Sequence, residues 1–368
     1  MFPVRSLLVR LGSAKFVTPF RVLAHSGFSV GSESSLVEDV YPAVEVFTSI
    51  DLDRIAYLRS DFEVRRKVVG KWFSLVRGAR SKSEIVFFGL RVNGSNVDRV
   101  SAEFLADVIG GFNVNVVFVP MTLDTSVKSY ISFAEAFTEA FKSTVYGEKA
   151  VLAYSIPPMI LRNYDALWKL LEYYRNKKPY VVVVDFNGFN AFSPSIRPSV
   201  IRVLRWIKSI ERELGRSCLV YGVNVGKGRS RRYPIPARDL ASIFAGFDVL
   251  GSNHTRPKMS REVYERLKVE GYEPKLLNIK DYGYLRLNEA LDYIPEGFEA
   301  KISLEKVRKN KDLYRAFNAE RQVIEAKHIV SLIEGGKNLK EYIKGKRYLD
   351  ERAKKTIFTI GSYSSSLS

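Results

Sequence analysis

Short, continuously apolar runs alternate along the chain with segments of helical periodicity. Strands buried on both faces give such runs, because neither face meets water. Eight runs, most of them separated by helical patterns, predict an α/β fold of the TIM (β/α)8 barrel type, with an open doubly wound sheet as the alternative. The predicted strands begin near residues 19, 84, 114, 149, 180, 218, 247 and 274.

Between the runs, apolar residues recur every three to four positions, as on one face of a helix. In residues 61–78, for example, Val64, Val68, Trp72 and Leu75 have this spacing. The rest of residues 35–80 has a mixed pattern, in which we predict no strand. The predicted helices cover residues 61–78, 100–109, 126–142, 165–175, 199–214, 239–245 and 262–270.

The composition changes after residue 300, where the chain becomes helical in pattern and strongly basic. We predict a barrel domain over residues 1–300, a basic helical segment over 301–357 and a tail over 358–368. The middle helix of the basic segment should pack on the barrel and leave its charged face outward. Its apolar stripe consists of Ala319, Val323, Ala326, Val330 and Ile333.

The chain carries 58 Lys and Arg against 40 Asp and Glu, a formal net charge of +18. Such a field favours a polyanion, most often nucleic acid, as substrate or partner. The alternative is a basic surface that serves solubility or stability. The single cysteine, Cys218, excludes a disulfide within the chain and argues against a cysteine-based zinc site. We therefore predict no metal and no cofactor.

The sequence carries no sign of export or membrane insertion. No apolar run approaches the about 20 residues that a membrane helix needs. Residues 1–10 are basic and mildly apolar, but no signal-peptide core with a cleavage site follows them. With one cysteine, a reducing compartment is the default. We predict a cytoplasmic protein with no membrane partner.

Two carboxylates follow predicted strands, at the positions where barrel enzymes place acids, bases and recognition groups. Asp185 follows the run YVVVV, and Asp124 follows VVFVPMTL. Asp124 also precedes Thr125, Ser126 and a predicted helix, so that helix capping is a competing explanation. Asp185 is the better candidate for catalysis.

A polar tip follows the strand near residue 247 and contains Ser252, Asn253 and His254. A histidine among such neighbours beyond a strand suggests a site, although a hydrogen-bonded loop histidine is the alternative. His25 also lies beyond a predicted strand, whereas His328 lies in the charged helix and is expected at the surface. The three scattered histidines give no metal-ligand spacing.

A basic loop follows Gly226, and it matches neither a Walker A motif nor GxGxxG. It suits contact with backbone phosphates, as do the basic C-terminal helices; an ordinary solvated surface is the alternative for both. The predicted nucleic-acid contacts are Lys227, Arg229, Arg231, Arg232, Arg256, Lys258, Lys337, Lys344, Lys346 and Arg347.

Four segments, in order, resemble the tRNA-guanine transglycosylases, which are TIM-barrel enzymes that exchange a guanine in tRNA for a 7-deazaguanine base. The early strand VTPFRVLA resembles the family's "ETPxFxPV". The strand VFVPMTLD resembles the family's strand that ends in an acid, and YGVNVG…AGFDVL resembles "GVG…P…(A/G)xGxDxFD". The fourth segment, AERQVIEAKHIVSLIEGGKNLKEYIKG, is similar to the family's C-terminal helix.

The resemblance breaks at the positions that carry the family's chemistry. In the frame Gly246-Phe247-Asp248-Val249-Leu250, the nucleophile position falls on Gly251, and Asp248 matches an earlier aspartate. The zinc cysteines are absent, Glu325-Ala326 stand where the family's His-Asn would fall, and no DSGGFQ segment occurs. A glycine cannot attack C1′ of a ribose. The resemblance implies that Gly222 and Asn224 join Asp124, Ser252, Asn253 and His254 in binding substrate.

Three functions follow as hypotheses. The first is a transglycosylase-like barrel that binds RNA, with tRNA as the expected partner, and acts as a non-catalytic subunit of a homo- or heterodimer. The second is an active base-exchange enzyme, a pentosyltransferase, with a relocated carboxylate, either Asp185 or Asp248. The third is a barrel enzyme for a small phosphorylated substrate, with Lys227, Arg229 and Arg256 on the phosphate.

Overall fold

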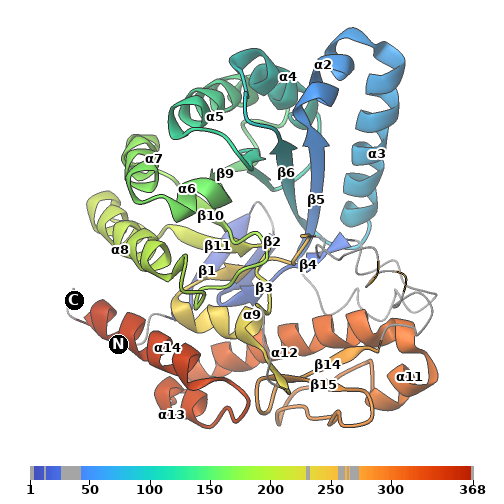
Figure 1. Cartoon of the computed structure of the whole chain (residues 1–368), viewed down its shortest axis with the longest axis vertical. Helices are drawn as coiled ribbons and strands as arrows, with labels where there is room; N and C mark the ends of the chain where they lie inside the picture. The colour runs from blue at the N-terminus through green and yellow to red at the C-terminus, as the bar shows by residue number, and fades with distance from the viewer. Residues whose placement is uncertain are drawn as a thin grey trace.

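The apolar runs form a parallel sheet that is nearly closed into a barrel, with helices around it (Figure 1). The computed structural model describes residues 4–11, 14–25, 43–228, 233–255, 262, 265 and 273–365. The strands of the sheet are β3 (Phe20–Arg21), β4 (Leu23–Ala24), β5 (Ala43–Asp51), β6 (Ile85–Asn93), β7 (Val116–Phe118), β8 (Met121–Thr122), β9 (Val151–Ile156), β10 (Val181–Asp185), β11 (Leu219–Val223) and β13 (Val249–Leu250).

The two ends of the sheet are joined through one short stretch of chain. The hydrogen-bonded order is β3-β13-β11-β10-β9-β7-β6-β5-β4, with β8 beside β6, and the paired strands are parallel. Only Val22 separates β3 from β4, and its amide donates to the carbonyl of Leu250 at 2.9 Å. Residues 20–24 therefore form both ends of this order: β3 pairs with β13, and β4 pairs with β5.

Side chains alternate between the inside of the sheet and the helix layer, as the two-residue period of a strand requires. The interior is a packed core in which Tyr221 lies against Phe87 and Phe118, with ring centroids 5.3 and 5.0 Å apart. A hairpin of β1 (Leu8–Leu11) and β2 (Ala14–Val17) adds Phe16 to this core. The interior is thus filled with side chains and is not a pore.

The surrounding helices occur close to where the hydrophobic periodicity predicts them. Polar residues cap several of them: Asp61, Asp98, Ser126 and Asn163 each accept a hydrogen bond from a backbone amide of the first turn. The helix predicted at 262–270 lies outside the described residues, apart from 262 and 265. The elements are α2 (Leu52–Ser60), α3 (Phe62–Arg80), α4 (Arg99–Ile109), α5 (Val127–Lys142), α6 (Pro158–Arg162), α7 (Tyr164–Lys177), α8 (Arg197–Leu214), α9 (Arg238–Ala241) and the 3-10 helix η2 (Ser242–Ala245).

Two of the strand predictions are wrong. The mixed sequence pattern predicts no strand at residues 43–51, where β5 is one of the longest strands of the sheet. The run near residue 274 forms β14 (Lys275–Asn278), which does not belong to the main sheet. It pairs antiparallel with β15 (Gly283–Arg286), and β15 pairs with β12 (Ile235–Pro236) in a separate sheet.

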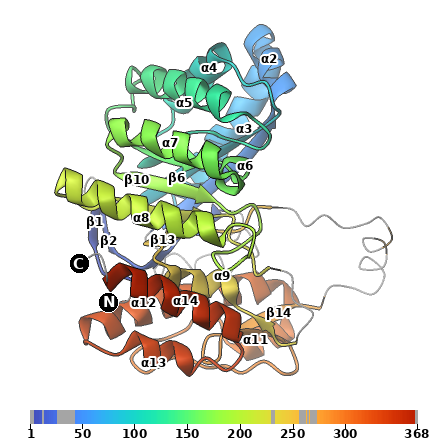
Figure 2. The same cartoon turned by 60° about the vertical axis from the view of Figure 1, so that its left-hand side comes forward.

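The C-terminal helices gather together beyond α8 (Figure 2). They are α11 (Leu304–Lys309), the 3-10 helix η3 (Lys311–Leu313), α12 (Tyr314–Glu334), α13 (Leu339–Lys344) and α14 (Glu351–Ser365). Helix α12 packs against β14 and against β3 of the main sheet. Helix α14 continues through Ser365, into the residues expected to form a tail.

The apolar stripe of α12 packs inward as predicted, with Val323 and Ala326 buried. The expectation that its charged residues face outward is wrong for Glu320, Arg321 and Glu325, which are buried. Arg321 forms ion pairs with Glu320 at 2.8 Å and with Asp292 at 2.6 Å. The charged face is therefore partly an internal polar network. None of the described helices combines the length and apolarity needed to cross a bilayer.

Candidate functional site

A cavity of about 1330 Å³ opens at the carboxyl ends of the strands. The chain supplies Asp51 and Asn93 from the ends of β5 and β6, and Asp124 and Asn187 from the turns after β8 and β10. The polar tip after β13 adds Asn253, His254 and Thr255. Parallel strands bring their carboxyl ends to one edge, which is why residues from distant parts of the sequence meet here.

The charge around this cavity is predominantly positive. Among the described residues, two carboxylates line it, those of Asp51 and Asp124, and Asp51 accepts a hydrogen bond from Asn93 at 2.9 Å. Six cations from the same described part of the chain line it, and α2, α3 and α6 carry four of them at its rim. They are Arg54, Lys67, Lys71, Arg91, Arg162 and Arg315. Such a cavity attracts an anionic ligand and, with the protein's net charge, raises its local concentration.

Asp185 lies at this site, but its carboxylate is fully engaged. It is buried, forms an ion pair with Arg91 at 2.6 Å, and accepts hydrogen bonds from Asn224 Nδ2 and from the Asn187 amide, each at 2.9 Å. Arg91 itself lines the cavity. Asp185 therefore orients a cation toward the ligand space, and the geometry gives it no free oxygen for attack on a substrate.

Asn224 connects this ion pair to the polar tip. Its backbone is left-handed, with φ of 56°, a conformation in which asparagine is several-fold enriched. Its side-chain oxygen accepts from the His254 amide at 2.9 Å while its Nδ2 donates to Asp185. The predicted substrate-binding role of Asn224 is thus replaced in the structure by a buried bridging role.

Glu45 is a site residue that the sequence analysis missed. Its side chain lies on the same face of β5 as Phe47. Its buried carboxylate contacts His254 Nε2, the Tyr221 hydroxyl and the Ser252 amide. The His254 ring also stacks on Phe47, with centroids 4.7 Å apart. Burial and the nearby carboxylate raise the pKa of Tyr221 well above its usual value, so its hydroxyl stays protonated and donates to Glu45.

Gly251 has no space for a side chain. A Cβ atom there would overlap the Glu45 carboxylate and lie 2.6 Å from the Tyr221 hydroxyl oxygen. The carbonyl of Gly251 accepts from Arg21 at 2.6 Å. The position at which the transglycosylase resemblance would place a nucleophile is therefore occupied by a carboxylate that comes from β5.

The other predicted substrate-binding residues lie in different environments. Asp124 is exposed on the cavity wall, and Ser126 caps α5 in its place. Ser252 is engaged with the backbone, since its hydroxyl accepts from the Ala24 amide at 2.8 Å, whereas Asn253 is exposed at the cavity. Gly222 faces the helix layer, where a Cβ would meet Leu250, Phe247 and Phe186, so it lies away from the cavity.

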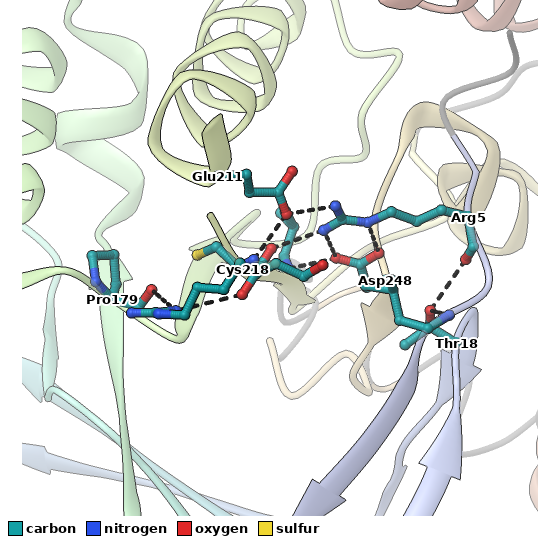
Figure 3. A network of polar contacts seen from close by, with 10 residues as sticks. Arg5, Thr18, Pro179, Glu211, Cys218 and Asp248 are labelled. Carbon is teal, nitrogen blue, oxygen red and sulfur yellow. Dashed lines mark hydrogen bonds and ion pairs between the residues drawn. The ribbon is translucent and has the colours of Figure 1, made fainter. Parts of the chain in front are cut away.

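Asp248 lies just before β13, at the amino end of the strand and so at the opposite end of the sheet from the cavity. Figure 3 shows it beside Arg5, Glu211 and Cys218. Arg5 pairs with it at 2.8 Å and also contacts Glu211 and the Cys218 carbonyl. Asp248 also accepts from the Val220 amide at 2.9 Å. This network links the N-terminal segment to the strands. Asp248 therefore lies outside the candidate site, contrary to its predicted catalytic role.

The Cys218 thiol of this network is buried, and burial raises its pKa to about 12. A protonated thiol beneath the sheet is a poor nucleophile and a poor metal ligand. In the described part of the chain, no cluster of three or more His, Cys, Asp or Glu side chains could hold a metal ion.

The predicted nucleic-acid contacts divide into exposed, buried and undescribed residues. Lys337, Lys344 and Arg347 are exposed. Lys346 is buried, where its ammonium donates to the Ile279 carbonyl at 2.9 Å, so its predicted contact with nucleic acid is wrong. Lys227 is half-buried, and its ammonium lies over the Tyr284 ring, 3.3 Å from the centroid. Five of the predicted contacts lie outside the described residues: Arg229, Arg231, Arg232, Arg256 and Lys258.

Neither His25 nor His328 belongs to the candidate cavity. His328 is half-buried between the rings of Phe298 and Tyr342, so the expectation of a surface position is wrong. Burial lowers its pKa, and it lowers the pKa of His25 in the same way. His254 is the predicted histidine that the structure brings to the site.

Comparisons with known proteins add little to this geometry. No family model matches the chain, and no curated protein matches it. Among solved structures, the enoyl reductase domain of MlnA from the macrolactin biosynthesis cluster of Bacillus amyloliquefaciens is similar over 90% of this chain and 96% of that chain, at 10% sequence identity and a TM-score of 0.34. A likeness at this level carries no argument about fold or function.

Proposed function

We propose that this chain is a transglycosylase-like TIM barrel that binds RNA, with tRNA as the partner, at the carboxyl end of its strands, without base exchange at residue 251. The observation that carries the proposal is the predominantly cationic cavity. Phosphate contacts supply most of the affinity for nucleic acid, and exposed lysines and arginines at a rim make such contacts. The formal net charge of +18 acts in the same direction.

The barrel part of the proposal is supported by how residues 20–24 pair. Taken as one strand, β3 and β4 join β13 to β5 and complete a ring of parallel strands. The interior then holds inward side chains in layers, and ligands are expected at the carboxyl ends of the strands, where the cavity lies.

A filter-binding titration with tRNA over a range of salt concentrations tests the proposal. We expect micromolar or tighter binding that weakens steeply with salt, because bound phosphates release counterions. The triple variant Arg54→Ala, Lys67→Ala, Lys71→Ala should bind at least tenfold more weakly and show a shallower salt slope. Absent or salt-insensitive binding would refute the proposal.

The matched control removes the same charge at the opposite end of the sheet. Lys142 and Arg212 lie in the last turns of α5 and α8, and Lys149 lies just before β9; all three are exposed. Replacing them with alanine lowers the net charge equally. If this variant loses as much affinity as the rim variant, binding depends on total charge and not on the cavity.

A second candidate function is base exchange with a relocated carboxylate, and the position of Glu45 favours it. Its carboxylate fills the space of a side chain at Gly251. Unlike an open nucleophile, this carboxylate must first leave the Tyr221 hydroxyl and the Ser252 amide, which it contacts in the structure. Incubation with tRNA and a labelled 7-deazaguanine should then incorporate the label and give a covalent adduct, because a carboxylate nucleophile must hold the ribose between the two bases. Both should be lost in Glu45→Gln and retained in Asp248→Asn. No incorporation into any RNA counts against this candidate.

A further inference from the structure

A second, smaller pocket of about 440 Å³ lies between the end of the main sheet and helix α12. It adjoins the cationic cavity, since Ala24, Asn253 and Arg315 line both. Lys227, from the loop after β11, and Arg21, from β3, supply positive charge to it. Its far wall carries Asp239, Tyr284 and Gln322.

Two buried polar atoms of this pocket lack a partner in the described part of the chain. Arg21 donates through Nη1 to the Gly251 carbonyl, but its Nε makes no hydrogen bond. Asp239 accepts from the Tyr284 hydroxyl through Oδ2 at 2.6 Å, but its Oδ1 makes none. Buried polar atoms are almost always hydrogen-bonded, so this donor and this acceptor call for partners that the described residues do not supply, either waters or groups of a bound ligand.

Neighbouring side chains hold the Asp239 carboxylate and the Lys227 ammonium in the pocket wall. The Tyr284 hydroxyl also accepts from Gln322 Nε2 at 3.2 Å, which fixes the Asp239 carboxylate through the tyrosine. The Lys227 ammonium lies over the Tyr284 ring. Burial lowers the pKa of Lys227, and a bound anion would favour its charged form and act against this shift.

We propose that this pocket binds a small phosphate monoester that bears a hydroxyl group, with Arg21 and Lys227 on the phosphate and Asp239 Oδ1 on the hydroxyl. In barrels of parallel strands, the loops after the last two strands often form a phosphate site. Lys227 follows β11 and Asn253 follows β13, the corresponding places in this chain. The proposal uses different residues from the RNA site and does not depend on it.

Isothermal titration of the full chain with inorganic phosphate, ribose 5-phosphate and ribose tests the proposal. We expect ribose 5-phosphate to bind, phosphate to bind at least tenfold more weakly, and ribose not to bind. No binding of either phosphate at millimolar concentration would overturn the site. Equal affinity for the two phosphates would overturn the role of Asp239.

Two variants and a control locate the binding. Lys227→Met keeps the apolar stem over Tyr284 and should weaken both phosphates at least tenfold, whereas Lys337→Met, at an exposed position, should change neither. Asp239→Asn keeps an acceptor for the tyrosine and should weaken ribose 5-phosphate alone. Unchanged affinities in both pocket variants would overturn the proposal, and Asp239→Asn decides it if Lys227→Met does not fold.

The rim variant Arg54→Ala, Lys67→Ala, Lys71→Ala should bind the small phosphates with unchanged affinity, so the two proposals can fail separately.

Discussion

The carboxylate of Glu45 occupies the space that a side chain on Gly251 would need. The two residues come from β5 and from the end of β13, and Tyr221 and His254 hold the carboxylate in place between them. A glycine is therefore required at residue 251 by packing, whatever the site does. The glycine at residue 251 and the buried acid at residue 45 are two aspects of one local arrangement.

Gly251→Ala should destabilise the fold. The added methyl group would overlap Glu45 and Tyr221, and overpacking of this kind costs about 1–3 kcal/mol. Urea unfolding should show the loss as a lower midpoint. The control is Gly70→Ala in α3, where nothing lies within 4 Å of the new Cβ and alanine is the better helix former. Equal stability of Gly251→Ala and the unmodified protein would contradict the packing argument.

The ion pair between Arg91 and Asp185 should behave as one unit. Asp185→Ala leaves a largely buried arginine without its partner, which costs about 3–5 kcal/mol of the free energy of unfolding. Replacing both residues, as Arg91→Met with Asp185→Ala, should cost clearly less than the sum of the two single changes, as a double-mutant cycle would measure. As a reference, Glu139→Ala breaks an exposed pair with Arg99 and should cost less than about 1 kcal/mol. Additive losses at the buried pair would show that the contact is not coupled.

Cys218 should make the fold less stable at high pH. Burial raises the pKa of its thiol from 9.0 to about 12, so the folded state holds the proton more tightly than the unfolded state. The thiol's contribution is therefore fully present below pH 9 and is lost as the pH rises toward 12. Tyrosines titrate in the same range, so the measurement is the difference in unfolding free energy between the unmodified protein and Cys218→Ala, followed from pH 8 to 11. A difference that does not change with pH would contradict the shift.

Thiol labelling provides an independent readout of the same residue. A buried thiol with a raised pKa reacts only when the chain opens, so an alkylating reagent at pH 8 should modify Cys218 at the rate of opening. Reaction at the rate of a free thiol would contradict its placement beneath the sheet.

Lys346→Ala should cost clearly more stability than Lys344→Ala, although the two lysines lie two residues apart. Lys346→Ala removes a buried ammonium that bonds to the Ile279 carbonyl and lies against Tyr342, and the carbonyl it leaves unpaired costs about 1–3 kcal/mol. Lys344→Ala removes an exposed pair with Glu341 and should cost at most about 1 kcal/mol. Thermal unfolding measures both changes. If Lys346→Ala unfolds at the same temperature as the unmodified protein, the lysine does not stabilise the core.

The sequence was informative where the pattern was strong and local. Uninterrupted runs such as 181–184 predicted strands well, because burial on both faces leaves no polar position. Strand β5 was missed because Glu45 and Thr48 interrupt its apolar run. Glu45, a residue of the candidate site, is thus one of the two positions that conceal the strand pattern. The run at β14 was misassigned because a short antiparallel strand gives the same apolar signal.

The site could be predicted only one residue at a time. Asp185, Asn224 and His254 were found by their places after strands, but the pairing of Glu45 with His254 joins residues 209 positions apart, and nothing local specifies it. The same limit applies to Lys346 and His328. A helical pattern shows which face is apolar, but it does not show that a further layer of chain covers the polar face.

The joining of β3 and β4 through Val22 also limits when the contacts of residues 20–24 can form during folding. The amide of Phe20 donates a hydrogen bond to the carbonyl of Asp248, and Arg5 forms an ion pair with the same aspartate. The residues that pair with the earliest part of the chain are therefore synthesised only near residue 250. Contacts of such long range are slow to form, because the intervening loop must be closed first. During synthesis β3 therefore remains unpaired on this side until β13 has been made.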